Sequence, residues 1–212
     1  MYQKPHYGLK LTERQKQFIY GGLLGDLCAV KPKGKNRNAY LSVNHSSKQA
    51  EYVQFKYSIL KPFVRVPPRI IQNFGWGKEL MAFHTLCHPE FTKIYNICYQ
   101  GGRKTISWDW LLKIHSPFAL AIWYMDDGSL NKSAATINTH SFSEDEQLIL
   151  QEWLQKRWKI YPIIKQDSRR KGFFLFFHAK ERDKFFDLIR SYVIPSMRYK
   201  ILPEIKPVPC VI

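Results

Sequence analysis

Two aspartates, Asp26 and Asp127, each end an apolar stretch with a helical pattern, one in each half of the chain. A carboxylate at a helix C-terminus meets the negative end of the helix dipole, which costs about 0.3–1 kcal/mol. A single acid there can be a solvated cap, but two acids brought together by paired helices repel each other strongly. A bridging divalent cation relieves that repulsion, so the pair predicts a metal site.

The chemistry expected at this pair is phosphodiester hydrolysis. Oxygen ligands alone favour magnesium over zinc, and we expect two or more Mg²⁺ ions at Asp26 and Asp127. Such ions polarise a phosphoryl group, lower the pKa of an attacking water and stabilise the leaving oxygen. Lys104 and Lys200 follow the two acids at similar intervals. They are candidate catalytic residues that orient water or neutralise charge, or else ordinary phosphate contacts or surface lysines.

The elements around the two acids occur twice in the same order, which indicates an internal duplication. Thr12 with Gln15 is a capping-box pattern for the first helix (12–27), and Ser116 with Pro117 is typical of a helix start. The further matched pairs are strands 39–46 and 134–141 with Asn44 and His45 matching Asn138 and His140, helix starts at Ser46 or Ser47 and at Ser143, helices 91–99 and 184–192, and extended segments 103–106 and 199–202.

Each half reads helix, hairpin, helix, hairpin, helix, which predicts an α+β fold of two pseudo-symmetric halves, 1–112 and 113–212. We expect the acid-bearing helices to pack against each other at the centre. Small residues permit such a close approach, whereas three exposed glycines would cost the helix about 2–3 kcal/mol. The small residues are Gly21, Gly22 and Gly25 on one helix and Ala119 and Ala121 on the other.

The composition points to a polyanionic partner. The net charge is +16, with 33 Lys and Arg against 17 Asp and Glu, and the aromatic share is 15%. Nucleic acid is the usual partner of such a chain, although a solvated basic surface or anionic lipid gives the same signal. His84, Cys87, His88 and Cys98 fit no zinc spacing. Without a signal core or spanning segment, we expect no membrane partner and a soluble protein in a reducing compartment.

The acidic segments resemble a known signature. GGLLGDL (21–27) and LAIWYMDDG (120–128) resemble the paired motif of LAGLIDADG homing endonucleases that carry two motifs on one chain, and RYKILP (198–203) is similar to their terminal lysine segment. The resemblance implies a monomer of two αββαββα halves, with the motif helices at the centre and antiparallel sheets forming a saddle over the DNA major groove. The expected outcome is double-strand cleavage of a long asymmetric target, leaving 3′ overhangs, by a protein encoded in an intron or intein.

The family's catalytic, metal-binding acid is the last one of each motif, which corresponds to Asp26 and Asp127 here. Gly25 and Asp126 precede these acids and are expected to offer backbone carbonyls. Leu27 and Ile122 stand where the family usually has glycine. These two departures affect how tightly the helices pack rather than the metal ligands.

Basic and amide side chains fall on the predicted turns and strands of both halves. Arginine can read guanine and asparagine can read adenine, whereas most lysines contact phosphate. A charged run on a loop can also be a solvated face. The candidate DNA contacts are Lys33, Lys35, Arg37, Asn38, Arg65, Arg69, Lys78, Lys132, Lys165, Arg169, Arg170 and Lys171.

An alternative function is an RNA maturase that assists splicing of a group I intron, alone or as a second activity, with intron RNA as its partner. Basic charge does not distinguish RNA from DNA. A transcription regulator on the same scaffold would normally add a helix-turn-helix domain, for which the chain has no room.

Overall fold

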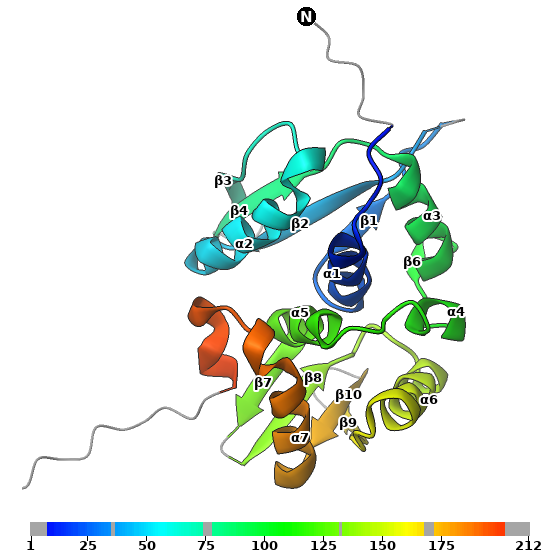
Figure 1. Cartoon of the computed structure of the whole chain (residues 1–212), viewed down its shortest axis with the longest axis vertical. Coiled ribbons are helices and arrows are strands. Elements are labelled where there is room, and N and C mark those ends of the chain that lie inside the picture. The colour runs from blue at the N-terminus through cyan, green and yellow to red at the C-terminus, as the bar shows by residue number, and fades with distance from the viewer. Residues whose placement is uncertain (1–7, 35–36, 74–77, 132, 168–171, 202–212) are drawn as a thin grey trace, which may run out of the picture.

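The structure, a computed structural model, describes residues 8–34, 37–73, 78–131, 133–167 and 172–201. Two four-stranded antiparallel sheets have the matching orders β1-β2-β4-β3 and β7-β8-β10-β9. The expected α+β fold with two pseudo-symmetric halves is therefore confirmed. Figure 1 shows helices α1 and α5 in the middle of the molecule, with one sheet on each side of them.

The first half contains the expected helices and strands and one short helix, Trp108–Leu111, that was not predicted. They are α1 (Glu13–Leu24), β1 (Cys28–Val30), β2 (Tyr40–Ser46), α2 (Ala50–Leu60), β3 (Arg69–Asn73), β4 (Lys78–His84), α3 (Pro89–Cys98), the short strands β5 (Tyr99–Gln100) and β6 (Arg103–Lys104), and α4 (Trp108–Leu111).

The second half repeats the order and ends in a 3₁₀ helix. Its elements are α5 (Pro117–Asp127), β7 (Gly128–Asn131), β8 (Ala134–Asn138), α6 (Glu144–Trp153), β9 (Ile163–Asp167), β10 (Gly172–Phe177), α7 (Ala179–Ile189) and the 3₁₀ helix Pro195–Lys200. Within the described residues, no helix combines the length and the apolar character that a bilayer crossing requires.

The predicted helix starts are present as hydrogen-bonded caps. The Thr12 side chain accepts from the Gln15 backbone N–H, and the Gln15 side chain accepts from the Thr12 N–H in return. Ser143 and Glu146 form the same reciprocal pair at α6. Ser116 caps α5, where Pro117 takes the first position because its missing N–H costs nothing there.

Close packing of α1 on α5 requires two of the three glycines. A Cβ at position 21 would lie 2.2 Å from the backbone oxygen of Ala119, and one at position 25 would lie 2.5 Å from Cβ of Asp126. Gly22 instead faces the side chain of Ile122, which is fully buried. The large residue that replaces a glycine in the second motif therefore packs against a small one in the first.

Each sheet buries one face and leaves the other open. In β2, Leu41 and Val43 lie in the core, whereas Asn44 is exposed on the opposite face. In the second sheet, Ile137 is buried and the next residue along β8, Asn138, is exposed. The helices and the apolar core cover one side, so polar side chains collect on the open side.

Three expectations about the later elements were wrong in detail. Helix α7 begins at residue 179 rather than 184, because its first turn is polar and gives no apolar signal. Residues 199 and 200, expected to be extended, belong to the 3₁₀ helix that starts at Pro195.

The strand register tests the predicted matches between the halves: Asn44 lies opposite Ala82 and Asn138 opposite Phe174. The residue after each asparagine is His45 in one half and Thr139 in the other, so His140 is not the counterpart of His45. The dividing line at residue 112 stays a prediction.

Candidate active site

The two motif acids lie where the motif helices end and the sheets begin. Asp26 follows Gly25, the C-cap of α1, and its side chain is 48% exposed; Asp127 is the last residue of α5 and is half-buried. Leu27 and Ala29 are in the core while Asp26 and Cys28 are exposed. This alternation puts Asp26 on the same side as the open face of the first sheet.

Electrostatics show that the acids form one cluster. Burial raises the pKa of Asp127 to about 8, and the charges of Asp26 and Asp126 contribute to the rise. Burial and the charge of Asp126 also raise the pKa of Asp26. Like charges in one partly desolvated site disfavour ionisation, and a bound cation reverses that preference.

The two candidate lysines occupy equivalent positions around this cluster. Lys104 Nζ donates to the carbonyl oxygen of Gly25 at 2.5 Å, and Lys200 Nζ donates to those of Met125 at 2.6 Å and Asp126 at 3.1 Å. Gly25 and Asp126 each precede a motif acid. The carbonyls expected to face a metal thus accept from ammonium groups, and burial lowers the pKa of both lysines.

Backbone contacts fix each lysine in place. Tyr124 of α5 donates its hydroxyl proton to the Lys200 carbonyl oxygen at 2.9 Å. On the other side, the carboxylate of Glu146 accepts from the Ile106 N–H at 2.8 Å and from Arg103. Because residues 103 and 106 flank Lys104, a side chain of the second half positions a lysine of the first.

Asp126 is the residue whose role the sequence analysis missed. Its side chain is fully buried and accepts from Lys56 Nζ at 2.6 Å and from the Tyr52 hydroxyl at 2.8 Å. It also accepts from the Asp26 N–H at 3.2 Å. Asp126 therefore anchors the end of α1 and the helix α2 to α5. The available signal was a lysine on the apolar face of α2, four residues after Tyr52 and four before Leu60.

His45 extends this network toward the first motif acid. Lys56 Nζ lies 2.9 Å from His45 Nε2, so Nε2 accepts and the proton of the neutral ring is on Nδ1. Nδ1 lies 3.7 Å from the Asp26 carboxylate. Burial and the adjacent Lys56 charge lower the pKa of His45 to about 4. The ring thus stays neutral at physiological pH; the Gln49 side chain hydrogen-bonds to it, whereas the Asp26 carboxylate lies beyond hydrogen-bond distance.

A second candidate metal cluster consists of Asp26, His45 and Asp126, whose ligand atoms lie within 4.8 Å of one another. The ammonium group of Lys56 already lies inside this trio and compensates Asp126. A divalent cation beside that ammonium would be repelled. Asp26 is also close enough to Asp127 to raise its pKa, and Lys104 and Lys200 lie beside that pair.

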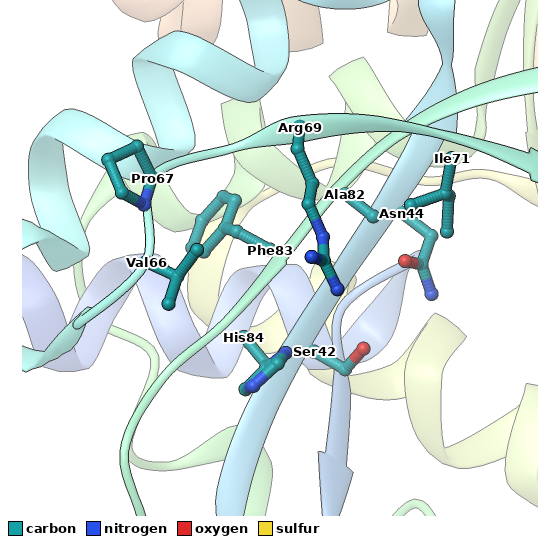
Figure 2. Close-up of a pocket in the computed structure, with 9 residues that line it drawn as sticks. All are labelled: Ser42, Asn44, Val66, Pro67, Arg69, Ile71, Ala82, Phe83 and His84. Atoms are coloured by element: carbon teal, nitrogen blue, oxygen red, sulfur yellow. The ribbon is translucent and has the colours of Figure 1, made fainter.

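One candidate DNA contact, Arg69, lies on the open face of the first sheet. A hollow of about 190 Å³ on this face is lined by none of the motif acids. Figure 2 shows the Arg69 guanidinium extending toward the side that carries Ser42, Asn44 and His84. Lys33, Arg37, Arg65 and Lys165 are exposed, while Asn38 accepts from the Thr92 hydroxyl at 3.0 Å. Lys78 begins β4, and Lys35, Lys132, Arg169, Arg170 and Lys171 lie outside the described residues.

Comparison with known proteins identifies the family. The model of the LAGLIDADG DNA endonuclease family matches residues 16–185. The chain is also 30% identical to DNA endonuclease I-ChuI of Chlamydomonas applanata, over 91% of this chain and 96% of that protein. The chain belongs to the LAGLIDADG DNA endonuclease family.

Two other similar proteins are not named as endonucleases. Protein RecA of Mycolicibacterium flavescens is 29% identical over 97% of this chain, but the chain spans only about half the length of that relative. Cytochrome b mRNA maturase bI2 of Debaryomyces hansenii is 25% identical, over 92% of this chain and 76% of that protein.

Solved structures of LAGLIDADG endonucleases share the fold. The homing endonuclease I-WcaI bound to its DNA recognition sequence matches with a TM-score of 0.81 and 24% identity, over 92% of this chain and 88% of that one. I-DmoI in complex with DNA and Mn matches with a TM-score of 0.51 and 16% identity, over 86% and 99%. The two-sheet architecture described above is therefore that of enzymes solved on DNA.

Proposed function

We propose that this chain makes a metal-dependent double-strand break in a long, asymmetric DNA target, with Asp26 and Asp127 as the catalytic metal ligands. The observation that carries the proposal is the convergence of the two motif acids and two lysines at the end of the helix pair. The sequence repeat nominates these four residues, and the contacts of Lys104 and Lys200 beside the motif acids support the proposal. The overhang would be 3′, as in the family.

The residues present fit magnesium, and we propose two or more ions. The site offers carboxylate oxygens, and burial together with the clustered negative charge raises the pKa of Asp127 to about 8, which a cation would relieve. When bound, magnesium supplies an activated water and stabilises the leaving oxygen. Lys104 and Lys200, next to the acids, neutralise charge on the phosphates. The buried Asp126 orients Asp26.

The DNA would lie along the open faces of the two sheets, because Asp26 shares that side of the first sheet. The candidate contacts there are Arg69 in the first half and Lys165 in the second, both exposed. The two halves present different side chains at equivalent positions, which supports an asymmetric target. Since both motifs are on one chain, we propose that a monomer binds one site.

The decisive experiment is cleavage of a plasmid library that carries random inserts of about two helical turns, in Mg²⁺, with sequencing of the cut ends. We expect a defined double-strand break at one family of sites. Asp26→Asn and Asp127→Asn should abolish cutting and retain binding in a gel shift. Asp187→Asn, an exposed acid on α7, is the matched control and should cut normally. Cutting by both motif variants at the rate of the unmodified chain would contradict the proposal.

A second candidate function is assistance of group I intron splicing, and the similarity to a cytochrome b mRNA maturase favours it. The same basic faces would then bind intron RNA. Splicing measured with the Asp26→Asn/Asp127→Asn double variant separates the functions, because RNA folding does not need the metal ligands. Splicing assistance that persists in this variant supports a maturase role. Absence of RNA binding by the unmodified chain excludes it.

A further inference from the structure

The open face of the second sheet carries two phenylalanines. In β10, Leu175 and Phe177 are fully buried in the core, and the alternating Phe174 and Phe176 project from the other face. Both rings are partly exposed, and neither is among the described side chains that pack against the core. Core packing within the described residues therefore does not explain them.

The register of the two sheets shows that these positions differ between the halves. In the first sheet the exposed Asn44 lies opposite Ala82, whereas in the second the equivalent Asn138 lies opposite Phe174. The first half therefore has a methyl group where the second half has an aromatic ring.

The next cross-strand pair on the open faces is also more apolar in the second sheet than in the first. Ser42 lies opposite His84 in the first sheet, and Thr136 lies opposite Phe176 in the second. A polar imidazole in one half thus corresponds to a phenyl ring in the other. At both positions the second sheet is the more apolar.

The strand beside the rings adds apolar surface. Ile163 pairs with Phe176 in the register and is 42% exposed. Lys165 pairs with Phe174 in the register. Its ammonium group lies 3.5 Å from the centre of the Phe176 ring and makes a cation–π contact with one face of that ring. Phe174, Phe176 and Ile163 form what we call the apolar patch.

The position of the patch indicates what it contacts. Asp127 directly precedes β7, and Ser129 of β7 pairs with Thr136, which is on the same face as Phe176. The acids and the patch therefore belong to one continuous side of the second sheet. If the proposed function holds, that side faces the major groove of the target. The one apolar group that a base presents there is the C5-methyl group of thymine.

We propose that Phe174 and Phe176 determine specificity by contacting thymine methyl groups in the half-site bound by the second half of the chain. Alternate residues of a strand lie about 6.8 Å apart, which is about two base steps along one strand of DNA. The two rings therefore read bases roughly two steps apart. The first sheet has the smaller Ala82 and the polar His84 at these positions, so we expect a weaker methyl preference there.

The test begins with selection of bound duplexes from a random DNA pool by the full chain, without divalent metal so that nothing is cut. We expect thymine at two positions of one half-site. In the selected duplex these thymines are then replaced by deoxyuridine, which removes only the methyl groups. Loss of each methyl contact should weaken binding by about fourfold.

Two variants complete the test. Phe174→Ala/Phe176→Ala should bind the thymine and deoxyuridine duplexes equally, and His84→Ala in the first half should keep the full thymine preference. Thermal unfolding checks that these exposed substitutions leave the chain folded. Equal binding of both duplexes by the unmodified chain, while the thymine duplex is still cut in Mg²⁺, overturns the inference and leaves the proposed function standing. A pool without any selected site contradicts both.

Discussion

Lys56 Nζ lies 2.6 Å from Asp126 Oδ1, and the side chains of both residues are fully buried. The pair joins α2 of the first half to α5 of the second. Each of these buried charges is tolerated only while the other compensates it. The pair therefore makes the packing of the two halves against each other specific. At the corresponding place in the second half, eleven residues after Thr139, stands the buried Leu150. The two sides of the active site are therefore built differently.

Removing one partner of this pair is expected to be costly. Lys56→Met leaves Asp126 buried without its cation, and we expect a loss of about 3–5 kcal/mol in the free energy of unfolding. Adding Asp126→Asn removes the stranded charge, so the double variant should be more stable than Lys56→Met alone. Urea denaturation of the unmodified chain and the two variants measures both effects. An unchanged unfolding midpoint for Lys56→Met would show that the pair does not hold the halves together.

The helix contact predicts opposite effects for two neighbouring glycines. Gly-to-Ala in an exposed helix stabilises by about 1 kcal/mol. Gly21→Ala would place a methyl 2.2 Å from the Ala119 backbone oxygen, so we expect separation of the motif helices, lower stability and loss of cleavage. At position 22 the nearest atoms are Cβ and Cδ2 of Leu27, both at 3.1 Å, so a shift of a few tenths of an ångström is enough to accommodate the methyl group. Gly22→Ala should keep most of its activity, and calorimetry with a cleavage assay compares the two variants.

The duplicated fold was predictable because it repeats local signals. Thr12, Ser116 and Ser143 start helices through hydrogen bonds that a sequence pattern encodes directly. The glycine spacing of α1 likewise predicted a close helix contact. The same patterns placed Asp26 and Asp127 at helix ends, which was sufficient to nominate them.

The contacts of the supporting residues could not be predicted in this way, because their partners are distant in sequence. The repeat nominated Lys104 itself but not the group that it binds. Lys56 meets Asp126 across 70 residues, and Lys104 reaches Gly25 across 79. No local rule selects the partner of a buried lysine. The prediction that His140 corresponds to His45 was wrong for a related reason. It matched the two residues by type, whereas the register of the strands decides which positions are equivalent.

The pKa of Asp127 predicts a pH dependence of metal binding. Its folded value of about 8 exceeds the ordinary 3.8. The folded chain therefore binds the extra proton between these values, and its metal-free stability falls as pH rises through them. Magnesium must displace that proton, so the rise in melting temperature caused by Mg²⁺ should grow from pH 6 to pH 8. Asp127→Asn should abolish this growth, and a Mg²⁺ effect that is equal at both pH values would contradict the assignment.

The last prediction concerns Glu146, which fixes Lys104 by accepting from the Ile106 N–H and from Arg103. Glu146→Gln keeps the size of the side chain and weakens the charged contact to Arg103. Because Lys200 is held separately by Tyr124, the change should slow cleavage of one DNA strand more than the other, so that nicked duplex accumulates. Glu144→Gln removes an exposed acid from the same first turn of α6 and is the matched control. Strand-resolved gels measure both rates. Equal slowing of the two strands would mean that Glu146 supports the fold as a whole rather than the position of Lys104.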